Sequence, residues 1–153
     1  MKKLILTSAL ALGIFVANAQ KIKEAAVPAV VKAKFASMFP GAKVEKWEKE
    51  GANFEAEFDQ GKVETSAVFD AAGNHLETEV EITASLLPKG VTEYMATNLK
   101  GKKIEDMAKI TDSKGVVTYE AEVDDVDYLF DASGKFLSKK VEKVDKEDKD
   151  DKK

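Results

Sequence analysis

Two stretches of this chain, Phe54-Glu55-Ala56-Glu57-Phe58 and Tyr119-Glu120-Ala121-Glu122-Val123, share one pattern of apolar and acidic residues. The two kinds alternate with a period of two, which is typical of a strand with one face buried and the other in water. Residues 75–82 alternate in the same way. The pattern therefore predicts an antiparallel sheet that is covered by helices on one side only.

The likeness extends along the chain, which contains an internal repeat. Four blocks recur in the same order: Val27-Pro28 and Leu87-Pro88, residues 41–45 and 101–105, the two alternating strands, and Phe69-Asp70 and Phe130-Asp131. Each unit alone would bury too little apolar surface to be stable, so two units sharing one core or one sheet are expected.

Each unit opens with apolar residues at helical spacing, over residues 27–39 in the first and 87–99 in the second. Short links that contain glycine, such as residues 50–53, 60–61 and 71–74, predict hairpin turns between the strands that follow. We predict an α+β fold of two tandem repeats, residues 20–83 and 84–144. Each is a helix followed by four antiparallel strands, with the helices packed on one face of the sheet.

The N-terminus has the three regions of a secretory signal peptide: Met1-Lys2-Lys3, an apolar run over residues 4–16, and Ala17-Asn18-Ala19. The alternative is a membrane anchor, but the run is shorter than the roughly 20 residues that cross a bilayer. We predict cleavage after Ala19, no membrane span afterwards, and a periplasmic or secreted product. Residues 145–153 contain no apolar residue and predict a disordered charged tail.

The composition excludes several kinds of chemistry. The chain has 153 residues, with 24 Lys and Arg, 28 Asp and Glu, one His and no Cys. Disulfides, thiolate nucleophiles, cysteine zinc sites and multi-histidine metal centres are therefore excluded. The acidic balance makes nucleic acid a poor partner. No cofactor, metal site or catalytic residue is predicted, and the oligomeric state stays open.

Two polar features have plain structural explanations. The loops Asp70–Asn74 and Asp131–Lys135 lack the alternating oxygen ligands of a calcium loop, whereas a turn with glycine at positive φ explains both. His75 falls on the wet side of its predicted strand, and its counterpart in the second unit is Phe136. We therefore expect a surface histidine and no duplicated catalytic role.

Several motifs together resemble one known family. They are Phe39-Pro40-Gly41-Ala42, Trp47, the Phe54-Glu55-Ala56-Glu57 strand, and Phe69-Asp70 with Gly73. The chain resembles the PepSY-like, β-lactamase-inhibitor-like family of small secreted proteins from Gram-negative envelopes. In the second unit, a weaker copy, Leu99-Lys100 replaces Phe39-Pro40 and Met107 replaces Trp47.

The resemblance implies a tandem helix-plus-sheet module that is periplasmic or secreted and non-enzymatic. The β-lactamase inhibitor for which the family is named uses its exposed sheet face to hold an enzyme. Because fold does not fix function, that role does not follow from the name alone.

Counting along the predicted strands places six apolar side chains on the outer sheet face: Trp47, Val68, Met107, Val116, Leu129 and Phe136. Together with Glu55 and Glu57, they predict a surface that binds an envelope protein or peptide, with apolar anchors and orienting charges. The alternative is that a bulge turns Trp47 inward, because one register slip reverses every side chain.

A rival hypothesis is an acidic cation-binding periplasmic protein. It is motivated by the outward carboxylates Glu55, Glu57, Glu77, Glu79 and Glu81. A carboxylate-based hydrolase is a third reading, which would need two facing carboxylates in a pocket. We expect these glutamates to form a solvated face.

Overall fold

The computed structural model describes residues 19–141. The predicted signal peptide up to Asn18 and the predicted tail lie outside the described residues. The elements are β1 (Gln20–Ile22), η1 (Glu24–Ala26), α1 (Ala29–Met38), β2 (Val44–Glu50), β3 (Asn53–Gln60), β4 (Val63–Phe69), β5 (His75–Glu81), η2 (Ala84–Leu86), α2 (Lys89–Asn98), β6 (Asp106–Asp112), β7 (Val117–Glu122), β8 (Val126–Asp131) and β9 (Phe136–Val141). The α+β class and the antiparallel sheet are confirmed.

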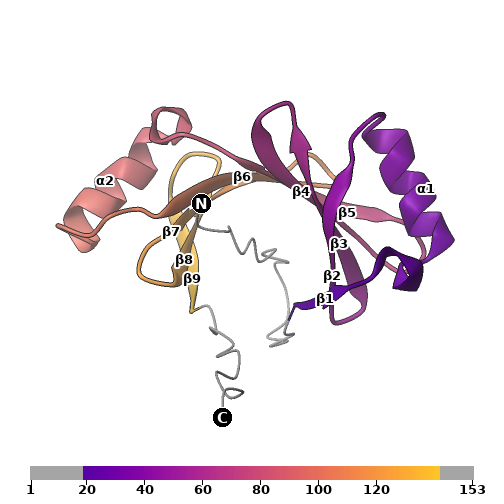
Figure 1. Ribbon diagram of the computed structural model, residues 1–153. Coiled ribbons are helices and arrows are strands. Elements are labelled where there is room, and N and C mark those ends of the chain that lie inside the picture. Colours follow the sequence, from indigo (N-terminus) through magenta and orange to yellow (C-terminus); the bar gives the residue numbers. More distant parts are fainter. Residues whose placement is uncertain (1–18, 142–153) are drawn as a thin grey trace, which may run out of the picture.

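All of these strands belong to one nine-stranded sheet in which each pairs with the next along the chain. β5 pairs directly with β6, with Glu79 opposite Ile110, so the two halves of the chain share a continuous sheet. β1 pairs with β2 at one edge and is a short strand that the sequence pattern does not predict. The sheet bends strongly, and its two ends curve to the same side (Figure 1).

Both helices lie on the convex side of this bend, α1 beside β2–β5 and α2 beside β7–β9 (Figure 1). From α1, Phe35 sets its ring edge-on to Trp47 and Phe58, with centroids 5.9 and 5.0 Å away. From α2, Tyr94 stacks on Phe136 with centroids 4.8 Å apart. Each helix thus closes its own aromatic core.

The cross-strand register shows that both cores use the same sheet face. Neighbouring partners run from Phe58 through Thr65, Val80, Lys109 and Tyr119 to Phe130. Directly opposed residues in a sheet point to the same side. Phe58 belongs to the first core and Phe130 to the second, so neither α1 nor α2 lies against the opposite face.

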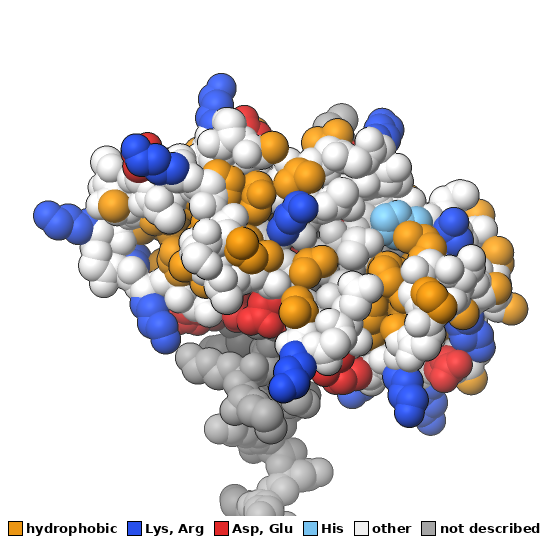
Figure 2. Space-filling model, turned by 90° about the horizontal axis from the view of Figure 1, so that it is seen from above, with side chains coloured by type: hydrophobic (Ala, Val, Ile, Leu, Met, Phe, Trp, Pro, Cys, Tyr) orange, Lys and Arg blue, Asp and Glu red, His pale blue; other side chains and the backbone are white. Residues whose placement is uncertain are grey.

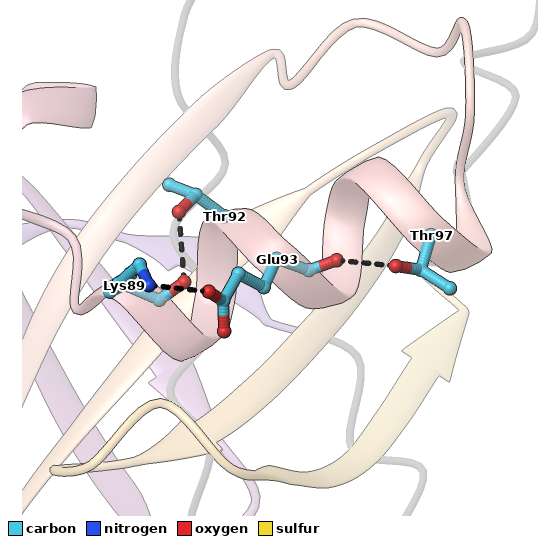
Figure 3. Close-up of polar contacts among 4 residues, drawn as sticks. All are labelled: Lys89, Thr92, Glu93 and Thr97. Carbon is cyan, nitrogen blue, oxygen red and sulfur yellow. Dashed lines mark hydrogen bonds and ion pairs between the residues drawn. The ribbon is translucent and has the colours of Figure 1, made fainter.

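Polar contacts on the outer side of α2 explain why this side of the helix faces the solvent (Figure 3). Lys89 Nζ lies 2.9 Å from Glu93 Oε1, an i,i+4 ion pair between exposed side chains. The hydroxyls of Thr92 and Thr97 donate to the carbonyls of Lys89 and Glu93 at 2.9 Å. These polar groups leave Val91 and Met95 to face the sheet, where both are buried.

The predicted turn around Asp70 is confirmed between β4 and β5. Asp70 Oδ1 accepts hydrogen bonds from the amides of Ala72 and Asn74, both at 2.9 Å, and Gly73 has φ +83°. Hydrogen bonds from Asn74 lower the pKa of the Asp70 carboxyl below its ordinary value. The carboxylate therefore closes the hairpin.

Candidate functional site

The sheet face opposite the helices carries the unusual chemistry of this protein. One cross-strand row on it reads Lys46, Glu57, Ser66, Glu79, Ile110. A second reads Glu48, Glu55, Val68, Glu77, Asp112, and a third reads Glu81, Ala108, Glu120, Leu129. We define the acidic face as Glu48, Glu55, Glu57, Glu77, Glu79, Glu120 and Asp127, with Lys46 at its edge.

The expectation of a solvated face is wrong for Glu55, Glu77 and Glu79, whereas Glu57 is half-buried and Glu81 is exposed. Glu55 is 1% exposed, Glu79 is 2% exposed, and Glu48, Glu77, Glu120 and Asp127 are also buried. The bend of the sheet makes this side concave (Figure 1). Glu79 on β5 accordingly has electrostatic neighbours on β3, β7 and β8. The helix side, seen in Figure 2, instead shows scattered apolar groups with Lys side chains around its periphery.

Lys46 partly balances the charge at one end of the acidic face. Its Nζ lies 2.6 Å from Glu57 Oε1 and 3.1 Å from Glu48 Oε1. This half-buried ammonium thus serves two carboxylates, on its own strand and on β3. Among the described residues, Lys46 does not form an ion pair with the carboxyl groups nearer the centre of the sheet, such as that of Glu79.

Glu79 occupies that centre, on the fifth of the nine strands. Within residues 19–141, neither of its carboxylate oxygens has a hydrogen-bond partner, and both are buried. Its flanking cross-strand neighbours are Ser66 and Ile110, and its electrostatic neighbours include Glu120, Glu55 and Glu77. A buried carboxyl with no partner and several acidic neighbours is strongly disfavoured in its charged form.

The pKa values of these carboxyls follow from their surroundings. Burial, reinforced by the charges of Glu57 and Glu48, raises the pKa of Glu55 to about 8. Burial, reinforced by Glu50 and Asp112, raises the pKa of Glu77 to about 7. Burial and neighbouring acids, Glu120 first, hold the pKa of Glu79 well above its ordinary value. These shifts favour the protonated, uncharged form of the carboxyls at the centre of the acidic face.

The predicted outward position of Trp47 is wrong. Its side chain is 5% exposed and belongs to the aromatic core under α1. The cause is a bulge in β2: Val44 lies opposite Phe58 but Lys46 lies opposite Glu57, so Glu45 is an extra residue. The bulge puts Val44 and Trp47 on the same side of the sheet.

Phe136 and Met107 are also misplaced by simple counting. A bulge between Leu129 and Phe130 puts Phe136 opposite Phe130, within the core under α2. Met107 lies opposite Ala121 and packs against the same core. The third bulge, beside Phe69, turns His75 to the helix side, where its ring lies edge-on to Phe69 and Nε2 is 2.8 Å from Thr78 Oγ1.

Three predicted site residues do lie on the uncovered face: Glu55, Glu57 and Leu129. Leu129 is half-buried there, and Val68, Ala108 and Ile110 add buried apolar surface. The sequence analysis did not include Glu48, Glu120 and Asp127 in the site. The Glu120 and Glu122 alternation was the available signal, but only the shared sheet brings β7 and β8 toward Glu79.

Other possible sites are modest. A shallow hollow of about 420 Å³ is lined by Lys34, Met38, Gly73, Asn74, His75 and Ser113. Among residues 19–141, no three His, Cys, Asp or Glu side chains are grouped so as to hold a metal ion. No helix in the described part of the chain is long and apolar enough to cross a membrane.

Comparison with known proteins identifies relatives of this architecture. A family model described as beta-lactamase-inhibitor-like, PepSY-like matches residues 15–66 and 52–138. Among the curated proteins, none matches.

Three solved structures, each from a Bacteroides species, share the fold. A BLIP-like protein of Bacteroides fragilis is 24% identical, with a TM-score of 0.61, over 78% of this chain and 92% of its own. A DUF2874 family protein of Bacteroides uniformis is 20% identical, with a TM-score of 0.66, over 74% and 88%. A protein of Bacteroides eggerthii that is described as periplasmic is 17% identical, with a TM-score of 0.67, over 74% and 88%.

Proposed function

Because this chain belongs to the beta-lactamase-inhibitor-like, PepSY-like family, we propose that it is a non-catalytic binding module of the bacterial cell envelope. It holds another protein or a peptide against the concave, uncovered face of its sheet. The description of the Bacteroides eggerthii structure as periplasmic supports an envelope location, as does the predicted signal peptide.

The observation that carries this proposal is the composition of the uncovered face. Seven consecutive strands, β2 to β8, contribute residues to it, and neither of the described helices, α1 and α2, lies over it. Leu129 supplies half-exposed apolar surface, and carboxyls of the acidic face lie beside it, with Glu120 directly opposite. Apolar contacts with a polar surround are the usual composition of a binding surface.

The test blocks this face with bulk. Leu129→Trp adds volume on the concave side, whereas Leu86→Trp adds the same volume at a residue of η2 that is 63% exposed. With residues 20–153 as bait, we expect one envelope protein to be captured by the unaltered chain and by Leu86→Trp. The amount of that envelope protein captured by Leu129→Trp should be at least tenfold lower. Equal capture by Leu129→Trp would remove the face from the proposal.

Cation binding is the second candidate, favoured by the buried carboxylate of Glu79 without a hydrogen-bond partner in the described residues. Calcium prefers carboxylate oxygens, and several would have to converge on one ion. Calorimetric titration with calcium chloride separates the candidates. Saturable heat that Glu79→Gln abolishes supports a cation site, and absence of heat at millimolar calcium removes it.

A further inference from the structure

We propose that the acidic face binds an extended peptide segment with lysine or arginine at alternate positions. This inference rests on the proposed function and names the chemistry of its partner. Three observations carry it: charge, an unpartnered buried group and spacing.

The first observation is the charge of the acidic face. It gathers seven carboxyl side chains, and Lys46 pairs with two of them at one end. Complementary charge steers encounter and selects partners of the opposite sign. A segment that carries cations therefore fits this face, and an acidic segment is repelled.

The second observation is Glu79, whose two buried oxygens have no hydrogen-bond partner within the described residues. It lies in the middle of the concave face, with Glu55, Glu77, Glu120 and Asp127 acting on it electrostatically. Buried polar groups are normally hydrogen-bonded, so an unpartnered carboxyl at the centre of a binding face indicates a missing donor. An ammonium or guanidinium group is such a donor.

The third observation is spacing. Side chains two residues apart on a strand point the same way and are roughly 7 Å apart. Such pairs occur on three strands of this face, as Glu55 and Glu57 on β3, Glu77 and Glu79 on β5, and Glu120 and Glu122 on β7. Alternate side chains of an extended peptide have the same repeat. A peptide with cations at alternate positions can therefore meet carboxyls in register.

The raised pKa values of carboxyls at the centre of the face support the inference. Burial raises the pKa of Glu55 to about 8 and that of Glu77 to about 7. A cation close to a carboxyl favours its charged form. Entry of lysine side chains therefore lowers these pKa values, and the protons pass to the buffer.

The surroundings of Glu79 include charged groups on every strand that contributes to the face. They are Lys21 on β1, Lys46, Glu48 and Glu50 on β2, Glu55, Glu57 and Asp59 on β3, Glu64 on β4, Glu77 and Glu81 on β5, Asp106 and Asp112 on β6, Glu120 and Glu122 on β7, Asp127 on β8, and Lys140 on β9. Acids predominate among these groups. Binding of a cation therefore changes the pKa values of these carboxyl groups more than binding of a neutral or acidic group would.

The experiment is a calorimetric titration of residues 20–153 with a synthetic peptide of alternating lysine and threonine. At neutral pH, we expect saturable binding whose heat differs between phosphate and Tris, because released protons are taken up by buffers with different ionisation enthalpies. The affinity should rise with pH, by about tenfold per pH unit for each proton released. A peptide of alternating glutamate and threonine should not bind.

Two single charge changes locate the site. Glu79→Gln removes the central carboxyl, and we expect at least fivefold weaker binding and fewer protons released. Glu93→Gln is the matched control on the helix side, where Glu93 pairs with exposed Lys89, and should leave both values unchanged (Figure 3). If Glu79→Gln does not fold, Glu77→Gln provides the same comparison.

Three results would overturn the inference: no saturable binding of the lysine peptide, binding with the same heat in both buffers, or equal weakening by Glu79→Gln and Glu93→Gln. The proposed function can be judged separately. If Leu129→Trp still loses an envelope partner while the lysine peptide fails to bind, the face is a binding site for a partner of other chemistry.

Discussion

The indole of Trp47 lies edge-on to Phe35 and closes the core beneath α1, where its side chain is 5% exposed. Replacing a buried aromatic side chain with alanine loses its transfer free energy and leaves a cavity. We expect Trp47→Ala to lower the free energy of unfolding by about 3–5 kcal/mol.

Urea denaturation measures this loss, with Leu86→Ala as the control at an exposed apolar residue. The control should change stability by about 0.5 kcal/mol or less. If Trp47→Ala were equally mild, the indole could not be part of the core.

At the scale of elements, the two repeats carry bulges at corresponding places. Glu45 is the extra residue beside β2, and at the start of β6 the amide of Glu105 donates to the carbonyl of Glu122, which already lies opposite Asp106. The bulges beside Phe69 and Phe130 likewise correspond. Bulges increase local twist and bend a strand, so their repetition is consistent with a strongly bent sheet.

A second feature at this scale is the close contact between the β8–β9 turn and the start of α2. A Cβ on Gly134, in the β8–β9 turn, would lie 2.8 Å from Val91 N and 2.9 Å from Gly90 Cα, at the start of α2. The φ of Gly134 is +85°. The turn and the helix therefore approach so closely that both depend on the absence of side chains at Gly90 and Gly134.

We expect Gly134→Ala to destabilise the protein more than Gly101→Ala does. Gly101 has a similar φ, +80°, but a Cβ there would meet nothing within 4 Å. Gly101→Ala should cost about 1–2 kcal/mol for the left-handed conformation alone, and Gly134→Ala about 1–3 kcal/mol more for the steric overlap. Thermal and urea unfolding measure both, and equal losses would contradict the close approach.

For the whole molecule, the acidic face predicts an unusual dependence of stability on pH. The folded-state pKa of Glu55 is about 8, against an ordinary value of 4.5, so between these values the folded protein holds a proton that the unfolded chain has released. Stability is therefore fully present below the ordinary pKa and is lost as pH rises through the folded one. Glu77 and Glu79 act in the same direction.

We expect the free energy of unfolding to fall between about pH 5 and pH 8, by as much as about 1.4 kcal/mol per pH unit for each such carboxyl. Urea denaturation across this range measures the slope. Glu55→Gln should flatten it and raise stability at pH 8, whereas exposed Glu93→Gln should leave it unchanged. A stability that rises over this range would contradict the protonated centre.

Much of the architecture was accessible from the sequence. Period-two alternation in β3, β5 and β7, helical stripes ending at Leu99 and Phe39, and glycine turns led to the α+β class and its antiparallel strands. Parity was correct at Glu55, Glu57 and Leu129. It failed at Trp47, Phe136 and His75, each of which follows a bulge or lies opposite one, and at Met107.

A signal for two of these failures was present in the chain. Val44 and Trp47, like Ile104 and Met107, are apolar pairs three residues apart, which strict alternation on a strand does not allow. Residues at such a spacing reach one face only if an extra residue is inserted between them. The repetition of the spacing sixty residues later favoured a bulge over chance.

The sequence by itself determined which strands and helices form, because hydrophobic period and turn chemistry are local properties. Only the tertiary structure decided which acids come together. Glu79, Glu55 and Glu120 lie on three different strands, and their burial depends on one sheet bending over its whole width. A carboxyl's pKa responds to everything packed around it, and that surrounding exists only once β5 has paired with β6.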